Sequence, residues 1–345
     1  MTIEKIINQQ KFQDELKGIA LQQKRPLEEV QKEAKLCITE MYAEQNPIAN
    51  MATLKGFEYM LSKAYEDKID VDRQEIKKLM KIMRKNSVAF ILTHKTYLDT
   101  VVLVTTLHRY GMPLPYFFGG INLAMPGIKQ LGKSSGLIFL RRSFKDDTVY
   151  KASLRHYISC FIENGNHLTW NIEGTRSRTG KIVYPQMGIL KYIMEGEQAS
   201  SRDIKYVPVS IVYDLIPDVK EMTEEGKGTD KKSENLALFG KYLKNLGHRY
   251  GRVSIRFGEP VENSQHTNAI IPDMEEDSYA DKNTLPRFAF ELIHKANTIT
   301  PVTTVSLVCN ALLNNFALTK KEIEINVIKL MNYIEQRKED VLLDR

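Results

Sequence analysis

The chain contains 345 residues, of which 42% are hydrophobic and 27% are charged, and its formal net charge at pH 7 is +6. This length and composition predict a folded protein with either one large domain and attached pieces or two domains. The basic excess is too small to indicate nucleic-acid binding. Cys37, Cys160 and Cys309 are far apart, which argues against a disulfide scaffold or a zinc cluster and fits a reducing compartment.

The first part of the chain is rich in lysine and glutamate and has helical periodicity. Its opening residues are charged throughout, whereas a secretory signal would need an apolar run. Pro26 is expected to start one helix, and apolar residues between Ile76 and Met83 define one face of a later helix. We therefore predict an N-terminal helical domain over residues 1–86.

Short apolar runs appear from residue 87 onward and predict buried strands. They are "SVAFIL", "GLIFL", "HLTWNIE", "YVPVSIVY" and "RVSIRFGEPV". Such runs, separated by helical or loop segments, are typical of an α/β sheet. We predict an α/β domain over residues 87–262, with a mixed, mostly parallel sheet flanked by helices, and then a C-terminal helical region over residues 263–345.

The first of these strands is followed by "THKTYLD", which places His94 five residues before Asp99. A histidine at the end of a strand lies at the edge where α/β sheets bind ligands. An aspartate one turn later can accept a hydrogen bond from one ring nitrogen, which leaves the other nitrogen free to act as a base. The spacing by itself is weak, and a histidine with a purely structural role is the alternative.

Two stretches have few charges and are candidates for membrane spans. Residues 110–128 are interrupted by prolines and glycines, so we expect an irregular, apolar surface. Residues 296–319 contain many asparagines and threonines, and Thr300 and Pro301 are expected to cap and start a packed helix there. Neither stretch predicts a transmembrane helix. Between Tyr213 and Leu236 the sequence is polar and predicts a solvated loop.

Residues 127–134, "GIKQLGKS", match the phosphate loop of nucleotide-binding proteins, and the overlapping "GKSSG" matches the elbow of serine hydrolases. Both motifs require a strand followed by a helix. Here a short helical pattern precedes a strand, and bulky side chains occupy the loop positions. We expect neither activity, and a nucleotide-binding protein that uses Lys133 remains a remote alternative.

Residues 173–181, "EGTRSRTGK", follow a predicted strand and concentrate groups that bind phosphate. Arginine pairs with phosphate oxygens through two parallel hydrogen bonds, and glycines allow backbone N–H groups to approach an anion. Glu173 at the strand end is expected to accept hydrogen bonds from a polyol or to hold the arginines. A solvated basic turn is the alternative.

Two further segments carry candidate site residues. Arg141 and Arg142 follow the strand "GLIFL" and point to opposite sides if the strand continues, so one of them would enter the site. Pro208 is expected to interrupt the strand "YVPVSIVY" and to shape the wall of the site.

These four segments, in this order, resemble the four conserved blocks of the glycerolipid acyltransferases. "HKTYLD" resembles the H-x-x-x-x-D block, "GLIFLRR" the block that ends in paired arginines, "EGTRSRTGK" the E-G-x-R-S-R block, and "VPVSIVY" the proline block. The resemblance is greatest to the glycerol-3-phosphate and dihydroxyacetone-phosphate acyltransferases and extends from about residue 88 to residue 262.

The resemblance implies roles for individual residues. His94 would be the general base and Asp99 the residue that orients it. Substrate binding would involve a larger set, namely Arg141, Arg142, Glu173, Gly174, Arg176, Ser177, Arg178, Lys181 and Pro208. Lys95, Thr96, Tyr97 and Asn171 depart from the common pattern, which leaves acceptor preference and acyl-chain length open.

The implied reaction transfers a long-chain acyl group from acyl-CoA or acyl carrier protein to the sn-1 hydroxyl of glycerol 3-phosphate, and it needs no metal or redox cofactor. Dihydroxyacetone phosphate and lysophosphatidate are alternative acceptors. The expected location is the cytoplasmic face of a membrane, with peripheral contact. Residues 110–128, flanked by Arg109 and Lys129, would make that contact or line the acyl channel.

Overall fold

The computed structural model describes residues 1–66, 68–121, 128–141, 143–144, 146–177, 179–227, 242, 246–247, 249–263, 281–313, 317–337 and 341–342. Its centre is a seven-stranded sheet in the order β1-β7-β6-β2-β5-β3-β4, in which β6 and β7 are the one antiparallel pair of neighbours. The prediction of a mixed, mostly parallel sheet is therefore confirmed. The strands are β1 Asp70–Val71, β2 Ser87–Leu92, β3 Tyr116–Gly120, β4 Leu137–Leu140, β5 Leu168–Asn171, β6 Ile204–Tyr213 and β7 Val253–Phe257; β8 Val302–Thr303 and β9 Val341–Leu342 form a separate pair.

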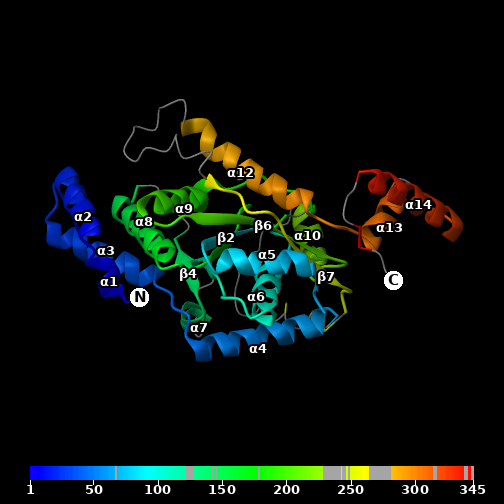
Figure 1. Cartoon of the computed structure of the whole chain (residues 1–345), viewed down its shortest axis with the longest axis horizontal. Coiled ribbons are helices and arrows are strands. Elements are labelled where there is room, and N and C mark those ends of the chain that lie inside the picture. Colours follow the sequence, from blue (N-terminus) through cyan, green and yellow to red (C-terminus); the bar gives the residue numbers. More distant parts are fainter. Residues whose placement is uncertain are drawn as a thin grey trace.

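Helices cover both faces of the sheet (Figure 1). The helices of the described residues are α1 Ile3–Ile7, α2 Gln10–Gln23, α3 Leu27–Met41, α4 Pro47–Ala64, α5 Arg73–Met83, α6 Asp99–Arg109, α7 Ile128–Ser134, α8 Thr148–Glu163, α9 Met187–Ala199, α10 Val219–Gly226, α12 Asp281–Thr298, α13 Thr304–Leu313 and α14 Lys320–Gln336.

The central strand β2 shows why its sequence is apolar at nearly every position. Val88 and Phe90 pack into the cluster formed with α5 and α6, whereas Ala89 and Ile91 pack into the cluster formed with α8, α9 and α12. Successive side chains of a strand point to opposite faces, so a strand covered on both sides has no polar face. Burial on both faces fixes the position of the strand end that carries His94.

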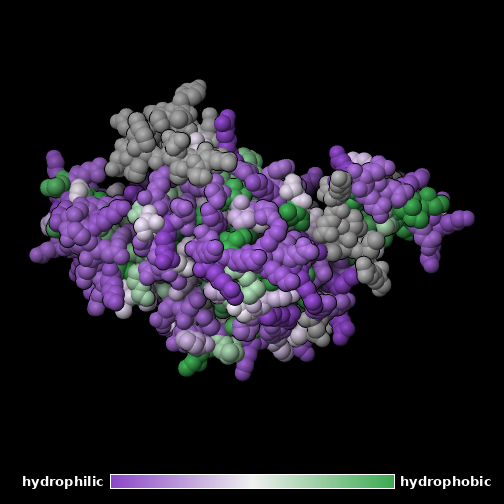
Figure 2. Space-filling model, in the orientation of Figure 1, coloured by the Kyte–Doolittle hydropathy of each residue, from purple (hydrophilic) through white to green (hydrophobic). Residues whose placement is uncertain are grey.

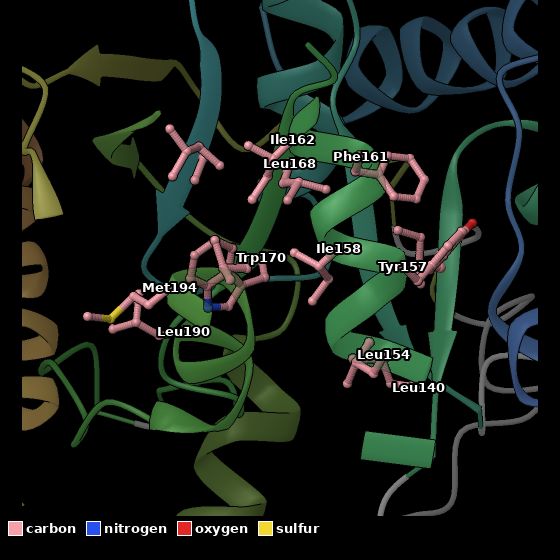
Figure 3. Packing of buried hydrophobic residues seen from close by; sticks show 14 of the residues in the cluster. Leu140, Leu154, Tyr157, Ile158, Phe161, Ile162, Leu168, Trp170, Leu190 and Met194 are labelled. Carbon is pink, nitrogen blue, oxygen red and sulfur yellow. The ribbon is translucent and has the colours of Figure 1, made fainter. Parts of the chain in front are cut away.

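Helix α8 contributes many side chains to the cluster that contains Ala89 and Ile91, as the close-up view shows (Figure 3). Its side chains meet Leu168 and Trp170 of β5 and Leu190 and Met194 of α9. This packing holds β5 between β2 and β3, and it therefore places the segment 173–181 next to the end of β2.

The N-terminal helices share the core of the sheet. Ile38 of α3 lies in the same cluster as Ile91 of β2, and Leu61 of α4 lies in the same cluster as Phe90. Residues 70–71 form the edge strand β1. The division at residue 86 stays a prediction, but the hydrophobic packing is continuous across it.

Pro208 does not interrupt its strand, contrary to the prediction. Strand β6 runs through it, and Pro208 pairs with Ile91 of β2. The ladder with β7 ends at the pair Val209–Phe257, and the Pro208 carbonyl accepts from Gly258 N over 2.8 Å. The missing N–H thus falls beyond the last pair of the β6–β7 ladder, where a proline costs no ladder hydrogen bond.

Three other local predictions need correction. Residues 116–120, expected to be irregular, form β3, and the rest of that stretch between residues 122 and 127 lies outside the described residues. The expected loop after Tyr213 contains α10. Helix α13 begins at Thr304, not at Pro301, because residues 302–303 pair with β9.

Helices α13 and α14 lie at the end of the molecule opposite α1–α3 (Figure 1). In this orientation the surface is mostly hydrophilic, with hydrophobic side chains gathered near α13 and α14 (Figure 2). Among the described residues, no helix is both long enough and apolar enough to cross a membrane.

Candidate active site

His94 lies just after β2, the strand between β6 and β5, and Asp99 is the first residue of α6. The Nδ1 atom of His94 is 3.1 Å from Oδ2 of Asp99. A carboxylate accepts hydrogen bonds, so the proton of the neutral ring is on Nδ1 and Nε2 keeps its lone pair. The His94 side chain is 18% exposed, and that of Asp99 is 2% exposed. The predicted pair is thus a buried carboxylate beside a partly accessible imidazole.

The Asp99 carboxylate is held by further donors. Its Oδ2 atom accepts from the backbone N–H groups of Lys95 and Thr96 at 2.8 and 3.0 Å, and its Oδ1 atom accepts from the Tyr213 hydroxyl at 2.8 Å. Burial, reinforced by the nearby Asp99 carboxylate, raises the pKa of Tyr213 well above its ordinary value. The phenol therefore stays protonated and can act as a donor.

Lys95 ties the same loop to β6. Its amine donates to the Ile211 carbonyl over 2.7 Å, and burial lowers the pKa of Lys95. Lys95, which departs from the common pattern of the resembled family, thus makes a structural contact beside His94.

The segment 173–181 is bonded directly to the His94 backbone. Glu173 is buried, and its carboxylate oxygens accept from His94 N at 2.5 Å and from Val183 N at 2.6 Å. Ser177 N donates to the His94 carbonyl over 2.8 Å. The structure therefore brings the two motifs together, and it places Glu173 as a support for the backbone at His94 and at Val183, just after the segment.

The small residues of this segment shape its turn. Gly174 has φ +67°, and a Cβ there would lie 2.8 Å from Cγ of Gln186. The Ser177 side chain is buried and donates to the Lys181 carbonyl, whereas the Lys181 side chain is exposed. Ser177 thus closes the turn, and Lys181 remains accessible to an anion.

Arg176 lies beside the His94 loop with its side chain 9% exposed. Its guanidinium carbon is 4.1 Å from the centre of the Tyr97 ring, and Nη1 is 3.7 Å from Oδ1 of the buried Asp218. The arginine is therefore oriented by a stacked ring and a carboxylate.

Arg141 binds partners outside the group formed by His94, Asp99 and the segment 173–181. Its guanidinium bonds to Glu40 of α3 and to Asp147, with shortest distances of 2.6 and 2.8 Å, and lies over the Tyr150 ring. These contacts link the end of β4 to the N-terminal helices. Arg142 and Arg178 lie outside the described residues, so their predicted roles stay predictions.

The phosphate-loop alternative does not fit the structure. Lys133 and Ser134 are the last residues of α7, and β4 follows them. The Lys133 amine donates to the Thr39 carbonyl over 2.8 Å. The order is helix and then strand, the reverse of a phosphate loop.

Three residues around the site were not identified from the sequence, namely Tyr97, Tyr213 and Asp218. Tyr213 had only a weak signal, because its strand also contains Lys205, Tyr206 and Ser210. Asp218 had none, because its contact with Arg176 depends on how the chain returns after β6.

Comparison with known proteins supports the resemblance noted in the sequence. Residues 72–212 match the family model described as Acyltransferase, and residues 222–343 match the model of the glycerol-3-phosphate acyltransferase C-terminal region. The plsB1 proteins of Mycobacterium tuberculosis and Mycobacterium bovis, both named as acyltransferases, are 34% identical over 328 residues, which is 94% of this chain and 52% of theirs. A glycerol-3-phosphate acyltransferase of Haemophilus influenzae is 27% identical over 296 residues, which is 84% of this chain and 36% of the relative.

Among solved structures, the 1-acyl-sn-glycerophosphate (LPA) acyltransferase PlsC of Thermotoga maritima aligns with a TM-score of 0.39 and 18% identity, over 71% of this chain and 81% of that chain. The chain spans about half the length of the mycobacterial relatives. The two family matches follow one another and together take in most of the chain. The chain therefore consists largely of two segments, one that matches the acyltransferase family and one that matches the glycerol-3-phosphate acyltransferase C-terminal region.

Proposed function

We propose that the protein transfers a long-chain acyl group from a thioester to the sn-1 hydroxyl of glycerol 3-phosphate and so forms lysophosphatidate. The observation that carries the proposal is the contact between the two motifs. The His94–Asp99 pair would supply the base, and the segment 173–181, bonded to the His94 backbone through Glu173 and Ser177, would supply the cationic groups.

In this mechanism His94 Nε2 takes the proton of the acceptor hydroxyl as its oxygen attacks the thioester carbonyl. The tetrahedral intermediate then breaks its C–S bond, and the imidazolium returns the proton to the departing thiolate. Asp99 keeps the ring oriented and stabilises the imidazolium. Arg176, with Arg178 and Lys181 from the same segment and Arg142, would bind the phosphate, whereas the Arg141 guanidinium is already bonded to Glu40 and Asp147. No metal or redox cofactor is required, because the thioester is already activated.

The assay that tests the proposal supplies glycerol 3-phosphate with palmitoyl-CoA or palmitoyl-acyl carrier protein and follows thiol release and the lipid product. Dihydroxyacetone phosphate and lysophosphatidate are offered in parallel as the alternative acceptors. Acyl transfer to glycerol 3-phosphate at the highest kcat/KM supports the assignment. Thiol release that needs no acceptor, or that is fastest with another acceptor, contradicts it.

Arg178→Ala is expected to raise KM for glycerol 3-phosphate by about 10–100-fold and to leave KM for the thioester nearly unchanged, because a charged hydrogen bond to phosphate is worth about 1.5–3 kcal/mol. Initial rates at varied concentrations of each substrate measure the two values. The control is Lys133→Ala, which removes the apparent phosphate-loop lysine and should leave both values unchanged. Equal effects of Arg178→Ala on both substrates would contradict its role.

We also propose peripheral contact with the cytoplasmic face of a membrane, through a surface different from residues 110–128. Within that stretch residues 116–120 belong to the sheet, and the flanking Arg109 is paired with Glu58. A more suitable surface adjoins the site: Ile182, Val183, Tyr184 and Phe290 are exposed. We call these four residues the apolar patch. Lys181 and Arg287 beside it are also exposed and would favour anionic lipid.

The double variant Tyr184→Ser, Phe290→Ser is expected to weaken binding to vesicles of phosphatidylglycerol and phosphatidylcholine at least tenfold. The two rings, whose centroids are 5.1 Å apart, would otherwise bury apolar area in the lipid. Vesicle co-sedimentation without substrates measures this. The control is Ile48→Ser, Met51→Ser, which removes exposed apolar side chains on α4. Equal losses in both variants would contradict the assignment of the apolar patch.

A further inference from the structure

Strand β6 places a second side chain against the carboxylate that orients His94. Tyr213, the last residue of β6, donates to Oδ1 of Asp99 over 2.8 Å, while Oδ2 of the same carboxylate contacts His94 Nδ1 at 3.1 Å. Tyr213 and Asp99 are both buried. Because water has little access, the strength of this hydrogen bond affects the carboxylate more than it would at a surface.

The phenol is itself held in place. The Tyr65 ring packs against the Tyr213 ring with 5.4 Å between their centroids, and the Tyr65 hydroxyl donates to the Leu215 carbonyl over 3.0 Å. Tyr65 is the C-cap residue of α4. The N-terminal helices therefore contribute to the position of Tyr213.

The other titratable groups around the pair are engaged elsewhere. Glu173 accepts from backbone N–H groups, Lys95 donates to a carbonyl of β6, and Arg176 faces Asp218. The Tyr242 hydroxyl is 3.3 Å from the Thr96 hydroxyl. Within the described part of the chain, the side chains hydrogen-bonded to the Asp99 carboxylate are those of His94 and Tyr213.

We propose that Tyr213 is a positioning residue that sets the orientation and basicity of His94 through Asp99. The phenol fixes the rotation of the carboxylate by occupying its second oxygen. It also draws negative charge away from the oxygen that faces the ring, which weakens the hold of the carboxylate on a protonated imidazole. The expected effect on catalysis rests on the proposed acyl transfer, whereas the hydrogen bond between Tyr213 and Asp99 does not depend on it.

The test compares Tyr213→Phe with Tyr206→Phe. Both residues are buried tyrosines of β6 whose hydroxyl donates to a carboxylate, and Tyr206 bonds to Glu197 at 3.0 Å. Tyr213→Phe is expected to lower kcat on the order of tenfold and to move the acid limb of the kcat/KM profile to higher pH by about 0.5–1 unit. KM for the acceptor should not change, and Tyr206→Phe should leave the profile in place.

A measurement without substrates separates this inference from the proposed function. The titration of the His94 ring, followed by NMR, should shift to higher pH in Tyr213→Phe and stay in place in Tyr206→Phe, whether or not the protein transfers acyl groups. If Tyr213→Phe fails to fold, 3-fluorotyrosine at position 213 gives a stronger donor and should shift the titration to lower pH. An unchanged His94 titration in the folded variant, or equal shifts in both tyrosine variants, would overturn the proposal.

Discussion

Replacing His94 with alanine is expected to lower kcat for acyl transfer by about 10²–10⁴-fold with little change in either KM, because general base catalysis contributes an amount of this size. The substrate-binding groups remain, since Glu173 and Ser177 contact the His94 backbone and not its ring. Steady-state thiol release over a range of acceptor concentrations measures kcat and KM.

The matched control is His108→Ala, which removes an exposed imidazole from the last turn of α6. Its kcat should equal that of the wild type. Partial recovery of the His94→Ala rate by added imidazole would support loss of a base as the cause. Undiminished activity in His94→Ala would remove the base assignment.

Asp99→Asn is expected to lower kcat by about 10²–10³-fold and to move the acid limb of the kcat/KM profile to lower pH. The amide oxygen can still accept from the Lys95 and Thr96 N–H groups, so the loop should keep its shape. The negative charge beside the ring is lost, and the imidazolium that forms during the reaction is less stable. A ring that binds its proton more weakly is protonated only at lower pH, which gives the direction of the shift.

Asp72→Asn is the control for this substitution. Asp72 caps α5 by accepting from Gln74 N over 2.6 Å, and asparagine caps helices equally well. It should have the activity and the pH profile of the wild type. A shift of the Asp99→Asn profile to higher pH, or no shift with full activity, would show that the carboxylate does not act on His94.

Local patterns predicted β2, β4, β5, β6 and β7 and the contact of His94 with Asp99, but they missed β3, whose residues 116–120 were expected to be irregular. The segment 87–92 is apolar at nearly every position because both faces of β2 are buried, and this property is visible in the sequence. The five-residue spacing of His94 and Asp99 is weak evidence by itself, but the two side chains do meet, because the chain turns directly from β2 into α6. The prediction failed at Pro208, where the tolerance for proline depends on where the neighbouring strand β7 ends.

The environment of the pair depends on residues that are distant along the chain. Tyr213 contacts Asp99, 114 positions earlier, and Arg141 contacts Glu40, 101 positions earlier. No periodicity or motif encodes such contacts, because they follow from the order of strands in the sheet. The paired arginines illustrate this: alternation along a strand predicts two opposite directions, but β4 ends at Leu140 and Arg141 reaches Glu40 of α3 and Asp147 at the start of α8.

The sequence by itself determined the mixed α/β class, the proximity of His94 and Asp99, and the basic segment 173–181, because each depends on neighbours within one strand, turn or helix. The tertiary structure alone decided that Glu173 braces the His94 backbone, that Arg176 is held by Tyr97 and Asp218, and that Tyr213 supports Asp99. The physical reason is that a parallel sheet brings together the carboxyl ends of strands that are far apart in the chain, and only packing on both faces sets which side chains meet there.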